Sequence, residues 1–172
     1  MAIELMWVCG ILPDGLNRKV VETCREENRD IGLPETVFRF PMHISMKKSF
    51  NTDNFESVKK AVASYIERNR TISCRTGKPI ENKGMIWLPI IPDQEISNWH
   101  KGLDDMLRDN FNIPVLGYDK FFKPHVSLFT KGDSDKIDIM FERLCKTLPE
   151  MDFTIRRFVV GSSRHKDEYF EF

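Results

Sequence analysis

Two histidine–serine pairs supply residue types that suit acid–base chemistry. The first pair lies in His43-Ile44-Ser45-Met46 and the second in His125-Val126-Ser127-Leu128. Imidazole has an ordinary pKa of about 6.5, so near neutral pH one ring can accept a proton while another donates one. Two such rings facing one phosphodiester predict general acid–base catalysis. One histidine would activate a water or a ribose hydroxyl, and the other would protonate the departing oxygen.

The residues around each pair alternate as they do in a β-strand, where successive side chains point to opposite faces. We expect the first motif strand to run from about Thr36 to Phe50 and the second from Phe122 to Phe129. The first polar face would hold Arg39, Pro41, His43, Ser45 and Lys47, and the second Lys123, His125, Ser127 and Phe129. Both strands should be central, adjacent or near-adjacent, and should face one cleft. The serine hydroxyls would then donate hydrogen bonds to non-bridging phosphate oxygens.

Further residues on these faces are candidates for substrate contacts. Arg39, Lys47 and Lys123 would add positive charge, and Phe129 would stack on a base. Solvated ion pairs at the rim are the alternative for Arg39 and Lys47. No carboxylate or cysteine set near either motif completes a metal-ligand sphere, so we expect neither a metal nor a cofactor.

Other notable residues have simpler interpretations. We interpret Trp87 as a core residue, with base stacking as the alternative, and His100 as a packing residue on a helix flank. Arg164 and His165 belong to a predicted turn, with a substrate role as the alternative.

The two motifs lie 82 residues apart (125 − 43 = 82), and this offset relates longer segments. It superposes two apolar helix faces with the same i, i+3, i+7, i+11 spacing. These faces are Phe55, Val58, Val62 and Ile66 in the first half, and Ile137, Met140, Leu144 and Leu148 in the second. Applied backwards, it carries the strand-like residues 3–9 onto 85–91. The sequence therefore predicts an α+β fold with strand–helix–strand–helix in each half. Near the end of the chain we expect a further strand from Phe153 to Val160 and a final edge strand from Tyr169 to Phe172.

Composition limits the class of protein. A chain of 172 residues fits one domain, or one domain made of two lobes. Lys plus Arg equals Asp plus Glu at 26 each, so no global positive field would recruit long nucleic acid. Of the four cysteines, which lack metal-type spacing, we expect three to be buried free thiols. No stretch approaches ~20 apolar residues and no leader pattern begins the chain, so we expect a cytoplasmic monomer without membrane contact.

The paired motifs resemble those of the two-histidine (2H) phosphoesterase superfamily, and in particular its 2′-5′ RNA ligase-like or cyclic phosphodiesterase branch. The string from Phe122 to Leu128 looks like that family's second motif, where proline before the histidine is common. The resemblance covers essentially the whole chain, as a single bilobal domain over residues 1–172. It implies a pseudo-two-fold symmetric α+β fold, in which two antiparallel-rich sheets line a central cleft and the helices lie outside.

The resemblance also implies an activity and its residues. The reaction would be metal-independent hydrolysis of a 2′,3′-cyclic phosphate, a cyclic nucleotide or a 2′-5′ phosphodiester, with a small nucleotide or RNA end as substrate. His43 and His125 match the catalytic histidines, while Ser45 and Ser127 match the phosphate-contacting hydroxyls, often threonine in relatives. Two alternatives stay open, a non-catalytic nucleotide- or RNA-binding module and RNA ligation by the reverse reaction. The intact histidine–hydroxyl pairs favour the enzyme, because a binder has no chemical need for two proton carriers.

Overall fold

The computed structural model describes residues 3–91, 94–163 and 170–171. In its first part the elements are β1 (Glu4–Ile11), α1 (Asp14–Asn28), the 3₁₀ helix η1 (Thr36–Arg39), β2 (His43–Thr52), α2 (Phe55–Arg68), β3 (Ile72–Arg75), β4 (Ile80–Glu81) and β5 (Ile86–Pro89). In its second part they are α3 (Gln94–Phe111), α4 (Gly117–Lys120), β6 (His125–Phe129), α5 (Ser134–Thr147), β7 (Asp152–Ile155), β8 (Arg157–Ser162) and β9 (Phe170–Glu171).

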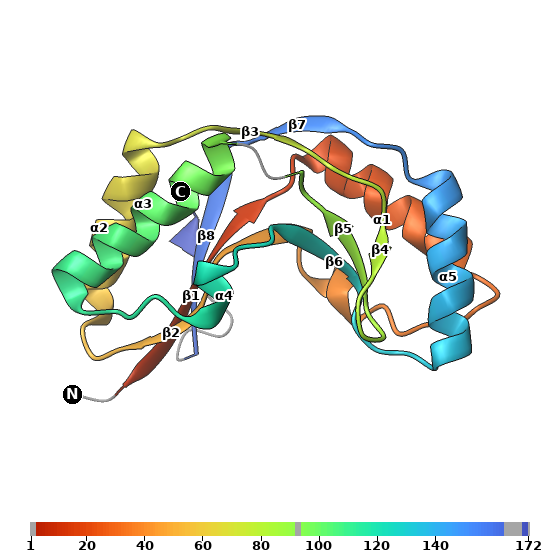
Figure 1. Cartoon of the computed structure of the whole chain (residues 1–172), viewed down its shortest axis with the longest axis horizontal. Helices are drawn as coiled ribbons and strands as arrows, with labels where there is room; N and C mark the ends of the chain where they lie inside the picture. The colour runs from red at the N-terminus through yellow and green to blue at the C-terminus, as the bar shows by residue number, and fades with distance from the viewer. Residues whose placement is uncertain (1–2, 92–93, 164–169, 172) are drawn as a thin grey trace.

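The described strands form three antiparallel sheets (Figure 1). The larger lobe contains the order β2-β1-β8-β9 and the smaller lobe the order β4-β5-β6, while β3 pairs with β7 where the two lobes join. The predicted α+β fold, with two antiparallel sheets facing a cleft and helices outside, is confirmed. The third sheet was not foreseen. Strand β9 pairs with β8, and the remaining residues of the predicted last strand, Tyr169 and Phe172, lie outside the described residues.

The first helix of each half of the chain packs in the lobe formed mainly by the other half. Helix α1 follows β1 but packs beside α5 in the smaller lobe, and α3 follows β5 but packs beside α2 over β2 (Figure 1). The short helices are exchanged in the same way, because η1 contacts β6 and α4 contacts β2. The two lobes are therefore interlocked rather than joined by a single hinge.

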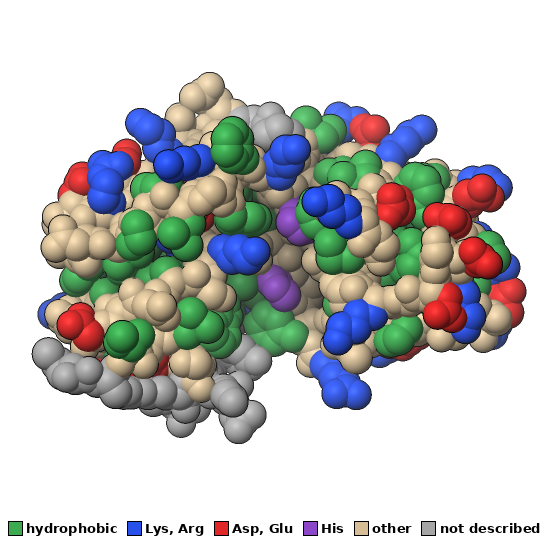
Figure 2. Space-filling view, turned by 60° about the horizontal axis from the view of Figure 1, so that its bottom comes forward, with side chains coloured by type: hydrophobic (Ala, Val, Ile, Leu, Met, Phe, Trp, Pro, Cys, Tyr) green, Lys and Arg blue, Asp and Glu red, His purple; other side chains and the backbone are tan. Residues whose placement is uncertain are grey.

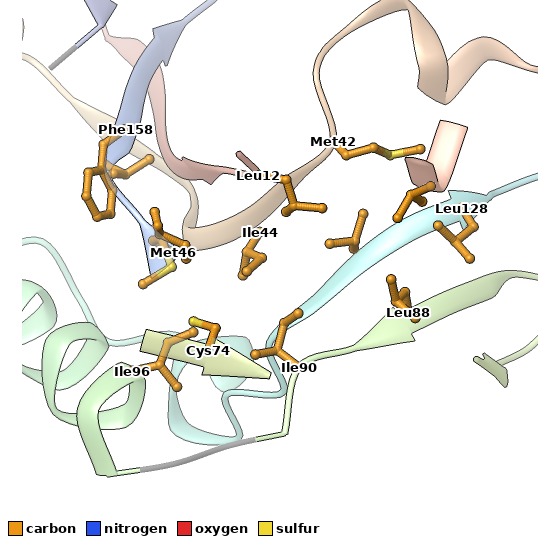
Figure 3. Packing of buried hydrophobic residues seen from close by; sticks show 14 of the residues in the cluster. Leu12, Met42, Ile44, Met46, Cys74, Leu88, Ile90, Ile96, Leu128 and Phe158 are labelled. Atoms are coloured by element: carbon orange, nitrogen blue, oxygen red, sulfur yellow. The ribbon is translucent and has the colours of Figure 1, made fainter. Parts of the chain in front are cut away.

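One apolar core runs behind both motif strands. The apolar faces predicted for α2 and α5 are buried in it, apart from the half-buried Phe55. Ile44 and Met46 of β2 belong to the same cluster as Val126 and Leu128 of β6 (Figure 3 shows part of it). Burying such side chains contributes roughly 1.5–3 kcal/mol each, so the backs of both strands are firmly anchored. Cys9, Cys24 and Cys74 are buried, and all four cysteines are free, as expected.

Several predicted boundaries are wrong. Both motif strands begin at the histidine, and residues 36–39 form η1 instead of strand. Pro41 lies two residues before the first of these strands and Pro124 directly before the second, and proline lacks the N–H that a strand ladder needs. The predicted strand at 153–160 is divided into β7 and β8, which pair in different sheets. The prediction that the 82-residue offset carries residues 3–9 onto 85–91 is also wrong. Cys9 lies opposite Ser45 and Trp87 lies opposite Ser127, so the strands before the two motifs are related by an offset of 78 residues (87 − 9 = 78).

Candidate active site

The two motif strands meet edge to edge between the lobes. Strand β2 is the edge of its sheet and β6 is the edge of the other, so the prediction of central strands is wrong. The two edges nevertheless contact each other, which confirms that the motif strands lie near one another. A groove opens on this face, with two histidine side chains in it and lysine and arginine side chains along its rims (Figure 2). Of the described histidines, only His43 and His125 are not buried.

Both imidazole rings are held in the same tautomer by equivalent hydrogen bonds. The Nδ1 atom of His43 lies 3.0 Å from the carbonyl oxygen of Pro41, and Nδ1 of His125 lies 2.8 Å from that of Lys123. A carbonyl oxygen can only accept, so Nδ1–H donates in each ring. The neutral ring therefore keeps its Nε2 lone pair free for proton transfer. This arrangement suits a base in one half and, once protonated, an acid in the other.

Burial and mutual repulsion both favour the neutral rings. Desolvation lowers the pKa of His43 below its usual 6.5, opposed by the hydrogen bond to Pro41. Desolvation also lowers the pKa of His125, opposed by the bond to Lys123, and the nearby charges of His43 and Lys48 lower it further. Because a charge on His43 lowers the pKa of His125, the two rings lie close enough for the protonation of one to disfavour that of the other. A bound phosphate would raise both pKa values again, because its negative charge favours imidazolium.

Aromatic side chains fix the planes of both rings. Trp87 stacks on His125, with ring centroids 3.8 Å apart and planes 15° apart. Phe40 meets the ring of His43 edge-on at 5.2 Å. Trp87 lies opposite Ser127 in the β5–β6 ladder and is half-buried, so our interpretation of it as a core residue is wrong. Such stacking also favours a protonated ring, since an indole face attracts cations.

The two serines occupy matched places beside the histidines. Ser45 and Ser127 are both half-buried on the faces that carry His43 and His125, as the alternation predicted. Ser45 lies opposite Cys9, and a hydrogen bond joins the two side chains. Burial raises the pKa of the Cys9 thiol to about 12, so this thiol stays protonated. Tyr118 of α4 donates a hydrogen bond of 3.3 Å to the carbonyl oxygen of Ser45, a contact that no sequence pattern indicated.

A β-bulge directly follows the serine of each motif and overturns two predicted substrate contacts. Cys9 pairs with Ser45 but Val8 pairs with Lys47, so Met46 is the extra residue; in the same way Leu128 is extra between Ser127 and Phe129. A bulge shifts the alternation by one, so the next side chain turns to the opposite face. Lys47 is consequently only 1% exposed and Phe129 is fully buried beside Phe38. Neither side chain can contact a substrate in the groove.

The remaining predicted cations are displaced from the strand faces. Arg39 is exposed on η1, and Lys123 is exposed just before β6, where its carbonyl oxygen orients His125. The bulge exposes Lys48 in place of Lys47, and Lys48 lies 5.3 Å above the ring of Tyr118 and close enough to affect His125. Lys48 therefore supplies the positive charge in the groove that strict alternation predicted for Lys47. Arg164 and His165 lie outside the described residues.

Comparisons with known proteins identify a matching family and solved structures with a similar fold. A sequence profile of the 2′-5′ RNA ligase superfamily matches residues 12–167. A crystal structure of a phosphoesterase aligns with 99% of this chain and 96% of its own at 10% identity and a TM-score of 0.64. E. coli LigT complexed with phosphate aligns over 100% and 95% at 11% identity, with a TM-score of 0.57. Kluyveromyces marxianus Usb1 aligns over 98% and 96% at 10% identity, with a TM-score of 0.53. No curated protein sequence matches the chain.

The chain has the fold of a solved phosphoesterase and of LigT, and it carries one His-x-Ser strand on each side of the groove. Because the profile spans nearly the whole sequence, the chain belongs to the 2′-5′ RNA ligase superfamily, within the 2H phosphoesterases. This membership supports an activity of the phosphodiesterase or ligase type. In the described part of the chain, no helix is long and apolar enough to cross a membrane.

Proposed function

We propose that this protein is a phosphodiesterase that cleaves a 2′,3′-cyclic phosphate, a cyclic nucleotide or a 2′-5′ phosphodiester without a metal ion. The observation that carries the proposal is the pair of equivalent imidazoles. Each donates through Nδ1 to the carbonyl two residues earlier, and each keeps Nε2 for the substrate. A ring held this way can pass a proton at one defined atom, which is the requirement for general acid–base catalysis.

The proposed step is an attack on phosphorus with a proton transfer at each end. One imidazole takes the proton from a water molecule as its oxygen bonds to phosphorus. The imidazolium on the other side gives its proton to the ribose oxygen as the phosphorus–oxygen bond breaks, which leaves a phosphomonoester when the substrate is a cyclic phosphate. Each proton transfer is worth about 10²–10⁴-fold in rate. The hydroxyls of Ser45 and Ser127 would donate to the non-bridging oxygens, where negative charge accumulates.

The charge distribution in the groove supports an anionic substrate. Lys48 is exposed and lies close enough to His125 to affect its charge. Lysine and arginine side chains line both rims of the groove (Figure 2). In the described residues, the one cluster with metal-type ligands comprises His100, Asp104 and Asp119 and is buried, whereas His43 and His125 face the groove. The groove thus offers the phosphate cationic side chains and hydroxyl donors.

We expect turnover that is resistant to chelation. The assay would use a panel of substrates after exhaustive EDTA treatment: cyclic mononucleotides, cyclic oligonucleotides, 2′-5′ oligoadenylate and an RNA oligonucleotide ending in a 2′,3′-cyclic phosphate. At least one should be hydrolysed at the same rate before and after chelation, because the proton carriers and hydrogen-bond donors are side chains of the protein. Binding of these compounds without turnover would favour a binding module. Strict dependence on added Mg²⁺ or Zn²⁺ would contradict the mechanism.

A further inference from the structure

A buried network of four ionisable side chains lies directly behind the first motif. The ammonium Nζ of Lys47 is 2.6 Å from Oδ1 of Asp104 and 2.7 Å from Oδ2 of Asp119. His100 completes the network, with Nε2 lying 3.3 Å from Oδ2 of Asp104. His100, Asp104 and Asp119 have the ligand types of a metal site, but the Lys47 ammonium already supplies the cation between the two carboxylates. All four residues are at most 6% exposed.

The network joins the two halves of the chain at the motif. Lys47 belongs to β2, whereas Asp119 belongs to α4 of the second half. Nδ1 of His100 donates to the carbonyl of Met46, the bulge residue, at 2.7 Å, and Nε2 lies 3.2 Å from the carbonyl oxygen of Asp119. The side chain of Asp119 also accepts from the backbone N–H of Leu116 at 2.9 Å, which fixes the start of α4. The ion pair therefore holds α4 against the bulge that follows Ser45.

The position of α4 determines where the second motif begins. Only residues 121–124 separate α4 from His125, and within this segment Phe122 stacks on His100 with centroids 3.8 Å apart. Both α4 and the connection to β6 are thus anchored to the same network. A shift of α4 relative to β2 would move His125 relative to His43 and would withdraw Tyr118 from the carbonyl of Ser45.

In the other half of the chain, the equivalent contact between a short helix and a bulge is apolar. Phe129 is the equivalent of Lys47 (129 − 47 = 82), and it packs edge-on against Phe38 of η1 with centroids 5.5 Å apart. An apolar pair can therefore join a short helix to the bulge of the opposite strand. Burying an ion pair usually brings no stability beyond that of a well-packed apolar contact, because desolvation opposes the attraction. Unlike an apolar contact, an ion pair with hydrogen bonds fixes the relative orientation of the two groups. This difference suggests a positioning role for Lys47 and Asp119.

We propose that Asp119, through its ion pair with Lys47, is a positioning residue that sets the spacing between the two histidine-bearing strands. Asp104 holds the same ammonium but belongs to α3, and it reaches the connection to β6 only indirectly, through His100. The two carboxylates therefore differ in function although both are buried and both contact Lys47. This inference rests on the proposed function for its kinetic consequence, but not for its structural one.

The test compares Asp119→Asn with Asp104→Asn. Each variant neutralises one of the two carboxylates that are paired with the Lys47 ammonium. Both variants should lose similar thermal stability. Asp119→Asn should lower kcat on cyclic-phosphate RNA by roughly 10–10²-fold, since a small misplacement of catalytic groups is that costly. Its KM should change by less than about threefold, because the groove side chains remain. Asp104→Asn should keep kcat within about twofold of the wild type.

A second readout does not need turnover. The ring signals of His43 and His125 in NMR spectra, recorded with and without inorganic phosphate, should move in Asp119→Asn and stay in place in Asp104→Asn. Equal kinetic losses in the two variants, or equal displacement of the ring signals, would overturn the positioning role and leave a purely structural network. If the wild type turns over no substrate, the proposed function fails, and the NMR comparison alone still decides this inference.

Discussion

Replacing His43 or His125 by alanine is expected to lower kcat by about 10²–10⁴-fold, the usual worth of one proton-transfer group. Each side chain is only half-buried and makes one hydrogen bond to a backbone carbonyl, so folding should be little affected. The double variant should be scarcely slower than either single variant, because a site without its base gains little from its acid. Single-turnover kinetics on the substrate identified by the panel would measure these rates.

A matched variant separates proton transfer from ring placement. His43→Asn keeps a donor near the position of Nδ1, which can still bond the carbonyl of Pro41, but it lacks the distal nitrogen. We expect it to be as slow as His43→Ala and to bind inorganic phosphate nearly as well as the wild type. A rate close to that of the wild type in any of these folded variants would show that the chemistry lies elsewhere.

The largest expected effect on stability belongs to Lys47. Lys47→Met should reduce the free energy of unfolding by about 3–5 kcal/mol, because it leaves the carboxylates of Asp104 and Asp119 buried without their cation. The adjacent Lys48→Met is the matched control. Its side chain is exposed, so its unfolding free energy should change by less than about 0.5 kcal/mol. Urea denaturation followed by circular dichroism would measure both.

Neutralising the partners should reverse much of this loss. Lys47→Met combined with Asp104→Asn and Asp119→Asn removes the uncompensated charges and should recover most of the stability. Similar losses for Lys47→Met and Lys48→Met would mean that the network contributes nothing to folding, contrary to its burial and short contacts.

Features set by local periodicity could be predicted from the sequence. The apolar faces of α2 and α5 and the polar faces around Ser45 and Ser127 come from short-range patterns, and the structure has them as expected. The 82-residue offset extends further than predicted, since it also relates the two bulges and the two carbonyl oxygens that orient the histidines.

Features set by long-range pairing could not be predicted in this way. The bulges at Met46 and Leu128 are visible only in the register with β1 and β5, and they bury Lys47 and Phe129, which strict alternation places on the polar faces. The swap of helices between lobes depends on packing between residues far apart in sequence. For this reason the contact of Tyr118 with Ser45, which lies 73 residues away, has no signature in the local sequence.

The central claim, that two imidazoles form one acid–base pair, is tested most directly by pH–rate profiles in chelated buffer. For the wild type, kcat/KM should be bell-shaped, because one ring must be neutral and the other protonated. Burial lowers both pKa values, so each ring is protonated only below its usual range, and the maximum for the free enzyme should fall below about pH 6.5. His43→Ala and His125→Ala should each lose one limb of the bell. A bell with both limbs unchanged in either variant, or a wild-type rate that rises steadily with pH, would contradict the pairing of the two rings.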